Sequence, residues 1–310
     1  MKSRKITRRR LLGAASFACA ATILGRPATA AEFEFKLGVN TPDTHPLTVR
    51  LTEAAREIGE RTKGRMTVTV FPNSQLGGDP EMLSQLRAGG IELLAAPSMT
   101  LSTLVPLSGL PSIGFAFQSY DQVWAALDGG VGSIVRDAIG KAGIVPMQRI
   151  WDNGFRQITS SASRRLNSVD DLRGFKIRVP VTALLTSLFS GLGALPSSIS
   201  YSELYSALQT HIVEGQENPL AQVSTGKLYE VQKYCALTNH CWSGYWIVAN
   251  PVRYRACQPT CLRASARALM PPPSGSAPIW WTWTARCRAN SPPRAWSSAR
   301  PIRRNFARHW

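Results

Sequence analysis

Two arginines beside short β-prone runs have the residue type and the setting to bind an anion. Arg156 lies in the run WDNGFRQITSS, and Arg178 lies in GFKIRVP. A polar Gly-Gln-Glu-Asn-Pro run follows at residues 215–219, and its composition predicts a turn. A guanidinium that is held by a strand can offer two parallel N–H donors to a carboxylate. The arrangement therefore predicts a site for a small carboxylate between fixed cationic groups.

Each of these polar residues also has a structural interpretation, which the sequence leaves open. Arg178 can pair with a protein acid, and Arg156 can form a salt bridge that stabilises a hinge. Asn218 can make an Asx-type turn before Pro219. Glu217 is better explained as structural than as ligand-binding, because an acid in the same site would oppose an anionic ligand.

Strands and helices alternate along the central part of the chain, residues 31–250. Alternating or continuous apolar runs predict strands at 32–40, 66–71, 91–96, 144–150, 177–179 and 245–249. Helical spacing predicts helices at 46–63, 80–88, 120–127, 131–142, 183–192 and 201–208, with Asp79 as a possible cap. This order is typical of an α/β sheet covered by helices on both faces. The glycine pairs lack the spacing of a phosphate-binding loop.

The basic excess of the chain lies at its two ends. The 310 residues carry a net charge of +17, of which +7 lies in residues 1–30 and +11 in residues 251–310. Residues 31–250 are therefore close to neutral. Because the excess does not gather on one folded face, we expect no nucleic-acid partner.

The first 30 residues have the pattern of an export signal. Arg8, Arg9 and Arg10 precede an apolar run of about 14 residues, which is too short to cross a bilayer, and Ala28-Thr29-Ala30 provides a cleavage context. The paired arginines favour the twin-arginine export machinery, with an ordinary Sec signal as the alternative. We therefore expect a periplasmic protein whose mature chain starts near Ala31.

Neither the cysteines nor the histidines form a catalytic or metal-binding pattern. Cys235 and Cys241 are best interpreted as buried free thiols, with a disulfide between them as the alternative. His45, His211 and His240 lie outside any nucleophile-elbow or metal-ligand spacing. We expect no metal, no cofactor and no enzyme activity; an exported hydrolase is the competing class.

The sequence changes character at residue 251. Residues 251–310 contain eleven arginines and nine prolines but no Asp, Glu or Lys. We interpret the segment as an aberrant, disordered basic tail produced by out-of-frame translation, so that the C-terminal elements of the fold are missing. In that case the product could be non-functional. An arginine- and tryptophan-rich arm for a membrane or nucleic acid is the alternative.

Seven motifs occur in order between residues 33 and 250. They are KLGVN, FPNSQLGG, RQITSS, LRGFKIRVP, SYSELYSALQT, VEGQENPL and KLYEVQKY. In these motifs the chain resembles the DctP-like extracytoplasmic solute-binding proteins of TRAP transporters. The resemblance implies a two-lobed periplasmic binding protein of type II-like fold with a ligand cleft between the lobes. Lobe I would comprise 31–153 and 244–250, and lobe II 154–243. The resemblance also implies that the protein captures a small organic acid and delivers it to TRAP membrane permease subunits.

The resemblance assigns roles to residues in both lobes. Arg178 matches the arginine that binds the ligand carboxylate, Arg156 matches a second arginine near it, and Asn218 matches an asparagine that hydrogen-bonds the ligand. Pro97 occupies the position where sialic-acid binders of the family carry a glutamate, which argues against sialic acid as the ligand.

Four further positions match the cleft less specifically. Asn40 and Asp79 match first-lobe positions that face the ligand, although Asp79 is equally well explained as a helix cap. Tyr201 matches an aromatic position that lines the pocket. Trp151 is a candidate apolar wall, with a place in the core as the alternative.

Overall fold

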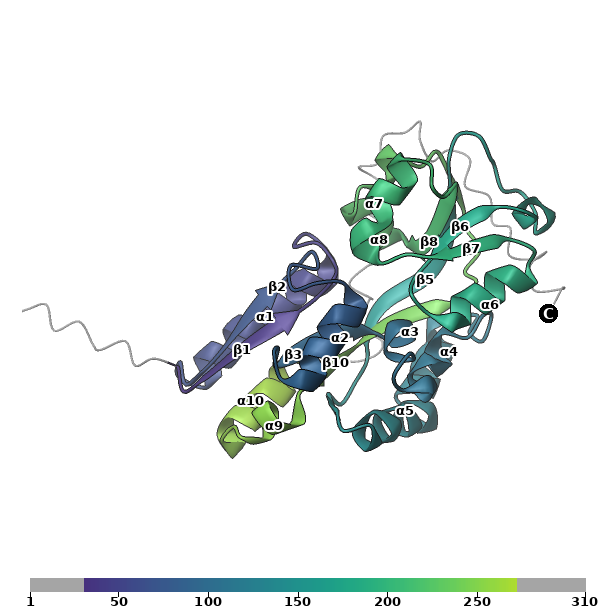
Figure 1. Cartoon of the computed structure of the whole chain (residues 1–310). Coiled ribbons are helices and arrows are strands. Elements are labelled where there is room, and N and C mark those ends of the chain that lie inside the picture. Colours follow the sequence, from purple (N-terminus) through teal and green to yellow (C-terminus); the bar gives the residue numbers. More distant parts are fainter. Residues whose placement is uncertain (1–30, 272–310) are drawn as a thin grey trace, which may run out of the picture.

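The computed structural model of the chain describes residues 31–271 (Figure 1); residues 1–30 and 272–310, which include the predicted export signal and most of the predicted tail, lie outside the described residues. The strands are β1 (Phe33–Gly38), β2 (Met66–Phe71), β3 (Leu93–Pro97), β4 (Val145–Pro146), β5 (Trp151–Ser160), β6 (Lys176–Val179), β7 (Leu195–Ser198), β8 (Gly215–Pro219), β9 (Tyr234–Ala236) and β10 (Trp242–Ala249). The α-helices are α1 (Pro46–Arg61), α2 (Asp79–Ala88), α3 (Ser98–Leu101), α4 (Tyr120–Leu127), α5 (Gly130–Lys141), α6 (Ala183–Gly191), α7 (Tyr201–Gln209), α8 (Leu220–Thr225), α9 (Pro251–Arg255) and α10 (Pro259–Ala268). Short 3-10 helices are η2 (Pro106–Ser112), η3 (Asp170–Leu172) and η4 (Leu228–Glu230).

One continuous sheet links two lobes through a long strand (Figure 1). The strand order is β2-β1-β3-β10-β5-β8-β6-β7, with β4 paired to β10 and β9 paired to β5. The first part of β5 pairs with β10, whereas its second part pairs with β8 and β9. Strand β5 therefore passes from lobe I, built on β1, β2, β3 and β10, into lobe II, built on β6, β7, β8 and β9. Its partner changes between Phe155 and Arg156, close to the predicted boundary after residue 153.

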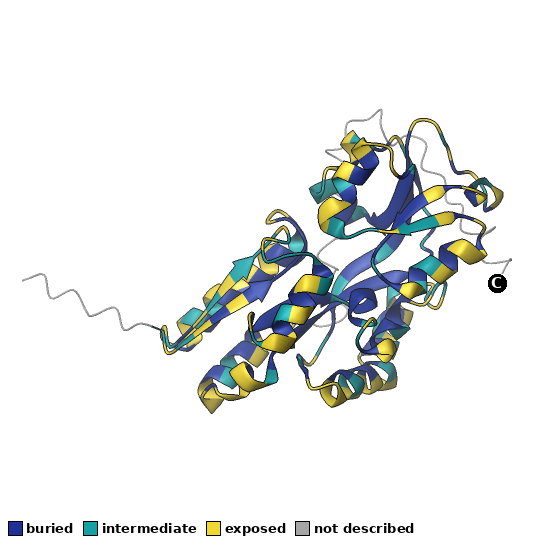
Figure 2. Ribbon diagram, in the orientation of Figure 1, coloured by how far each residue is buried: buried dark blue, intermediate teal, exposed yellow. Residues whose placement is uncertain are grey.

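The core of lobe I lies on both faces of its sheet (Figure 2). Leu93 and Ala95 of β3 pack in a cluster with α1 and α10. Leu94 and Ala96, which point to the opposite face, pack with α2, α4 and α5. Successive side chains of a strand alternate between faces, so a strand that is buried on both sides is apolar throughout. The sequence of β3 is continuously apolar because both faces of this strand are buried.

Lobe II has a core on one side of β6 and polar groups on the other. Ile177 and Val179 belong to an apolar cluster that also contains Phe175 and the inner face of α6. Arg178 lies between them in sequence and therefore points to the opposite face of the strand. A smaller apolar cluster joins α7, α8 and η4.

The prediction of a turn at residues 215–219 is wrong, because these residues form strand β8. All five are buried, and the strand pairs with β5 and with β6. Gly215 permits this close packing: a Cβ at this position would lie 2.3 Å from the carbonyl oxygen of Thr159 and 2.4 Å from the ring of Phe175. Long-range pairing therefore overrides the local turn preference of the sequence.

The prediction for the C-terminal segment is wrong for residues 251–268, which form helices α9 and α10. Tyr254 and Cys261 are buried in the same lobe I cluster as α1, whereas Val252 is 76% exposed. The inward positions hold tyrosine, cysteine, serine and alanine, so the helical period carries a weak apolar signal. A change of reading frame is not confirmed.

Candidate functional site

Arg178 is a buried guanidinium with an unused donor. The residue is 1% exposed, and its Nε donates a hydrogen bond of 2.8 Å to the carbonyl oxygen of Ile199. Its Nη1 is buried and has no hydrogen-bond partner, and no acid among residues 31–271 is in ion-pair contact with it. Burial lowers the pKa of Arg178 to about 10, so the group remains cationic at neutral pH. A buried cation with a free donor is a strong candidate for binding an anion.

The Arg156 guanidinium is already paired with a protein carboxylate. Its Nε and Nη2 donate to the two oxygens of Glu217, the Nη2 bond to Oε1 measuring 2.7 Å. Nη2 also donates to the carbonyl oxygen of Glu217 at 2.7 Å and to Oδ1 of Asn218 at 3.0 Å. The salt-bridge interpretation therefore describes Arg156 better than a bidentate fork on a ligand.

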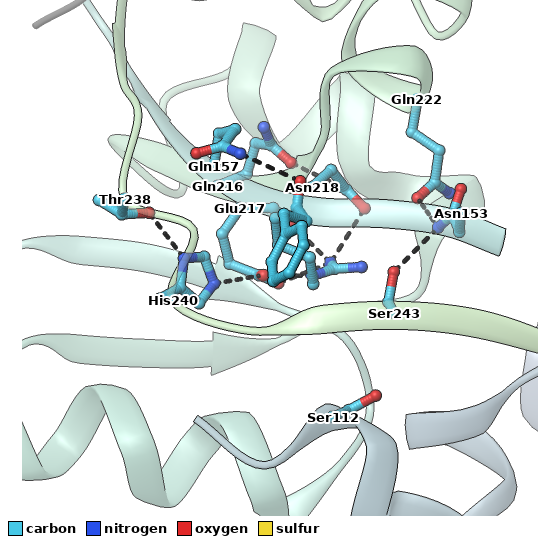
Figure 3. Close-up of polar contacts among 12 residues, drawn as sticks. Ser112, Asn153, Gln157, Gln216, Glu217, Asn218, Gln222, Thr238, His240 and Ser243 are labelled. Atoms are coloured by element: carbon cyan, nitrogen blue, oxygen red, sulfur yellow. Dashed lines mark hydrogen bonds and ion pairs between the residues drawn. The ribbon is translucent and has the colours of Figure 1, made fainter. Parts of the chain in front are cut away.

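Glu217 is held on its other side by His240 (Figure 3). Nε2 of His240 lies 3.0 Å from Oε2 of Glu217, and Nδ1 lies 2.8 Å from the hydroxyl of Thr238. Burial alone would raise the pKa of Glu217, but the Arg156 charge and the bonds from Arg156 and His240 outweigh it and lower the pKa. The carboxylate is therefore ionised and structural, as its sequence context predicted.

Glu217, His240 and Cys241 form a cluster whose ligand atoms lie within 4.8 Å of one another. A cation there would meet the guanidinium of Arg156, which already bonds both carboxylate oxygens of Glu217, so the set does not suit a metal ion. The same set does not suit nucleophilic catalysis, because burial raises the pKa of the Cys241 thiol and disfavours the thiolate. Cys235 and Cys241 are both buried free thiols, as predicted.

Asn218 lies on strand β8 and not in a turn. Its Oδ1 accepts from Arg156, and its Nδ2 donates 2.6 Å to Oε1 of Gln216. Gln216 in turn donates 2.8 Å to the hydroxyl of Thr159 on β5. The polar side chains of β8 are therefore buried with partners on both sides, and the predicted ligand contact of Asn218 stays a prediction.

Asn40 and Asp79 lie together in lobe I. Nδ2 of Asn40 donates 2.9 Å to Oδ2 of Asp79, and Oδ1 of Asn40 accepts 2.8 Å from the hydroxyl of Tyr245. The cap interpretation of Asp79 is wrong, because Gly78 is the N-cap of α2 and no side chain caps that helix. Burial raises the pKa of Asp79 to about 6, against the hydrogen bond from Asn40 and the charge of Arg178. Oδ1 of Asp79 has no partner.

A second buried set, which the sequence did not single out, lies where β5, β10 and α8 meet. Nδ2 of Asn153 donates 2.9 Å to Oε1 of Gln222 and 3.1 Å to the hydroxyl of Ser243 (Figure 3). Nε2 of Gln222 donates 3.3 Å to the hydroxyl of Tyr245. Oδ1 of Asn153 has no partner. The only local signal for Asn153 is its place in the run that also contains Arg156.

Tyr201 and Trp151 have different surroundings. The Tyr201 hydroxyl lies 3.4 Å from the carbonyl oxygen of Gln222, and burial raises its pKa to about 12 while the charge of Arg178 lowers it. Arg178 also bonds the carbonyl oxygen of Ile199, which precedes Tyr201 by two residues. Trp151 is a core residue instead: it packs in the lobe I cluster, and its indole donates 2.9 Å to the carbonyl oxygen of Leu269 after α10. The apolar-wall prediction for Trp151 is not supported.

Comparisons with known proteins agree with this fold. A model of the family described as bacterial extracellular solute-binding protein, family 7 (DctP), matches residues 37–263. The match continues into α10, beyond residue 250, where the sequence resemblance was expected to end. Within residues 31–271, no helix combines the length and apolar character needed to cross a membrane.

Two curated relatives cover most of the described chain. The C4-dicarboxylate-binding periplasmic protein DctP of Rhodobacter capsulatus is 35% identical over 251 residues, which is 78% of this chain and 72% of that protein. An uncharacterized protein of Sinorhizobium fredii, y4mM, is 38% identical over 241 residues. These residues are 77% of this chain and 44% of the Sinorhizobium protein, so the chain spans less than half of that relative.

Solved structures show the same fold. A TRAP periplasmic solute-binding protein from Sulfurospirillum deleyianum with bound succinate has a TM-score of 0.78 and 28% identity, covering 90% of this chain and 91% of its own. The sugar acid binding protein of Advenella mimigardefordensis in complex with galactonate has a TM-score of 0.74 and 29% identity, covering 77% of this chain and 76% of its own. The chain belongs to the DctP family, family 7 of the bacterial extracellular solute-binding proteins, and has the fold of TRAP periplasmic solute-binding proteins.

Proposed function

We propose that this protein is a periplasmic receptor that captures a small organic acid and delivers it to a TRAP-type membrane permease. The observation that carries the proposal is the free, buried Nη1 donor of Arg178. An ionised group that is buried without a partner is costly, and a carboxylate would supply both charge and acceptors. Family membership supports the same conclusion, since the Rhodobacter relative is a C4-dicarboxylate-binding periplasmic protein.

The two arginines have different parts in this proposal. Arg178 bonds the ligand carboxylate directly. Arg156 is locked to Glu217, so it contributes rigidity between β5 and β8 and keeps Glu217 from opposing the anion. Tyr201 and Asn218, which lie near the arginines, complete the polar surroundings of the carboxylate.

Export and delivery follow from the proposed location. The basic, apolar N-terminal pattern directs the chain out of the cytoplasm, and the twin-arginine machinery is the proposed route. In the periplasm the two lobes, joined by β5, close on the ligand as a hinge. The permease subunits then receive the ligand from the closed form.

Substitution of Arg178 by lysine tests the proposal, because lysine keeps the charge but loses the planar fork. Binding of gluconate, galactonate, succinate and lactate to the purified full chain is measured by isothermal titration calorimetry. We expect saturable one-site binding of at least one acid, recovered chemically unchanged. In Arg178→Lys that affinity should fall roughly thirty-fold or more, which is about 2 kcal/mol for lost charge-assisted hydrogen bonds.

Arg173→Lys is the matched control, because the Arg173 side chain is 79% exposed. That variant should bind as the unsubstituted chain does. Equal affinity of Arg178→Lys and the control, or turnover of the acid, would contradict the proposal.

A further inference from the structure

The two lobes approach each other closely at a glycine and a serine. Gly78 is the N-cap of α2 in lobe I, and Ser200 is the N-cap of α7 in lobe II (Figure 1). A Cβ built on Gly78 would lie 2.7 Å from the hydroxyl oxygen of Ser200 and 3.7 Å from its Cβ. The lobes therefore come together here only because position 78 carries no side chain. We call this contact between Gly78 and Ser200 the seam.

The local structure around Gly78 does not itself require a glycine. Its φ of −68° and ψ of 175° are extended values that any L residue adopts. Serine, threonine, aspartate and asparagine are favoured at a helix N-cap, yet no side chain caps α2. A Cβ at this position would also lie 2.7 Å from a carboxylate oxygen of Glu81, but that side chain is exposed and free to move. The constraint on position 78 therefore comes from Ser200 in the other lobe.

The lobe II side of the seam is attached directly to Arg178. The Nε of Arg178 donates 2.8 Å to the carbonyl oxygen of Ile199, the residue that immediately precedes Ser200. The segment that positions the guanidinium therefore also forms the contact with lobe I. A change in the distance between the lobes at the seam is transmitted to Arg178 through this short segment.

A second contact between the lobes follows Arg178 in the chain. The hydroxyl groups of Ser102, at the end of α3 in lobe I, and of Thr182, the N-cap of α6 in lobe II, lie 3.5 Å apart. Thr182 is four residues after Arg178, whose side chain is only 1% exposed. Both segments next to Arg178 thus touch lobe I. A solute can reach the guanidinium only after the groups around it have moved.

We propose that the seam is the gate of the site: Gly78 and Ser200 separate when an acid enters or leaves, and their close contact keeps a bound acid enclosed. This inference rests on the proposed function and adds a positioning role for two residues outside the set expected to bind the acid. A side chain at position 78 would hold the lobes apart and shorten the residence time of the acid. A covalent bond across the seam would stop both entry and release.

A pair of cysteines tests the gate without identification of the natural ligand. The 3.7 Å between the two Cβ positions lies in the range of about 3.5–4.5 Å that a disulfide requires, so Gly78→Cys combined with Ser200→Cys should form one. Oxidised glutathione accepts the two electrons and two protons of the thiols and leaves as reduced glutathione. Mass spectrometry of the full chain should then find residues 78 and 200 cross-linked, and dithiothreitol should reverse the bond. Each single cysteine variant is a control that cannot form it.

Exchange of a labelled acid shows whether the cross-link closes the site. The double variant is loaded with carbon-14 gluconate, galactonate, succinate or lactate, oxidised, and diluted into the unlabelled acid. Release should be slowed roughly a hundred-fold or more relative to the same sample in dithiothreitol, because the lobes can no longer separate. A double variant that is oxidised before the acid is added should take up little label.

Substitution of Gly78 by threonine tests the steric side of the gate. Threonine is as good an N-cap as glycine, so the melting temperature of the unliganded protein should not fall. Affinity should fall about ten-fold, as overpacking of a close contact predicts, and the loss should lie in the dissociation rate. Gly130→Thr is the matched control, because Gly130 also begins a helix and a Cβ there would have no neighbour within 4 Å.

The outcomes separate the gate from the proposed function. If the disulfide does not form, if it leaves release unchanged, or if Gly78→Thr binds like its control, the gate is wrong and the receptor function stands. If none of the four acids binds the unsubstituted chain, or if Arg178→Lys has no effect, the proposed function fails and the gate with it.

Discussion

Substitution of Asp79 by asparagine should stabilise the unliganded protein at neutral pH, although it removes a hydrogen-bonded side chain. Burial raises the pKa of Asp79 from 3.8 to about 6, so its charged form is disfavoured in the folded state. A shift of this size corresponds to roughly 3 kcal/mol of destabilisation above pH 6, since each pKa unit is about 1.4 kcal/mol. Asparagine keeps the acceptor for Asn40 and carries no charge.

The gain in folding stability from Asp79→Asn is smaller than the roughly 3 kcal/mol that removal of the buried charge would give. The reason is that the new amide N–H₂ takes the place of the unpartnered Oδ1 and itself lacks an acceptor. An unsatisfied buried amide costs about 1–2 kcal/mol. The expected net stabilisation is therefore about 1–2 kcal/mol at pH 7.5. For a chain of this size that is a rise in melting temperature of roughly 2–8 °C.

The sign of the pH dependence gives a second, independent measurement for Asp79. Between pH 3.8 and about 6, the folded protein holds a proton that the unfolded chain has released. Stability from this group therefore decreases as the pH rises through that window and stays low above it. Asp79→Asn should remove this decrease, so its advantage over the unsubstituted chain should be present at pH 7.5 and absent at pH 3.5.

Thermal unfolding of the full chain, followed by circular dichroism at both pH values, checks the expectation for Asp79. Asp170→Asn provides the control, because this carboxylate is 75% exposed and its removal should change stability little at either pH. A variant that is less stable than the unsubstituted chain at pH 7.5 would refute the reasoning, and so would a difference that does not depend on pH.

Three further changes test the framework around the site. Glu217→Gln leaves the Arg156 guanidinium buried without its counter-ion and should destabilise the protein by about 3–5 kcal/mol in urea unfolding; a loss below about 1 kcal/mol would contradict a structural role. Gly215→Ala places a methyl group 2.3 Å from a β5 carbonyl oxygen and should cost about 1–3 kcal/mol, whereas an unchanged unfolding midpoint would show that β5 and β8 can separate. Trp151→Phe loses the bond to the Leu269 carbonyl and should cost about 1 kcal/mol while making α10 more sensitive to limited proteolysis; unaltered cleavage would place α10 outside the lobe I core.

Where secondary structure is decided by local apolar spacing, the sequence is a sufficient guide. Strand β2 and helix α4 occupy the predicted residues, and the inward positions of α1 are apolar residues at helical spacing, such as Leu51 and Ile58. Strand β3 is continuous in apolar character because both of its faces are buried. Periodicity therefore predicts the α/β class, and the resemblance in the motifs implies the two-lobed TRAP-type fold.

Where residues distant in the sequence determine the local structure, the local sequence pattern is misleading. The residues of β8 are polar and include Gly and Pro, which favour a turn, but Glu217 and Gln216 find partners on β5 that lie about sixty residues earlier in the chain. Asp79 begins a helix and has the composition of a cap, yet Asn40 from another loop binds it. Neither partner can be read from a local pattern.

The C-terminal helices were missed because their inward residues are unusual. Tyr254, Cys261 and Ser265 occupy buried positions of these helices where leucine or isoleucine would give a clear period. The family match runs to residue 263 and α10 to Ala268, which does not confirm the hypothesis of a changed reading frame from residue 251. It stays a prediction.

Three buried polar atoms that lack a hydrogen-bond partner among the described residues belong to the candidate site. Arg178, Asp79 and Asn153 each bury one polar atom without a partner, and each such atom destabilises the fold by about 1–3 kcal/mol. A bound group that supplies the missing partner of any of these atoms removes that cost, so it stabilises the protein beyond the contacts it gains elsewhere. A ligand that satisfies Arg178 alone leaves two acceptors buried and unpaired. Affinity and specificity in this site consequently have the same physical origin. The rise in melting temperature that an acid produces should therefore increase with the number of these three atoms to which it supplies a hydrogen-bond partner.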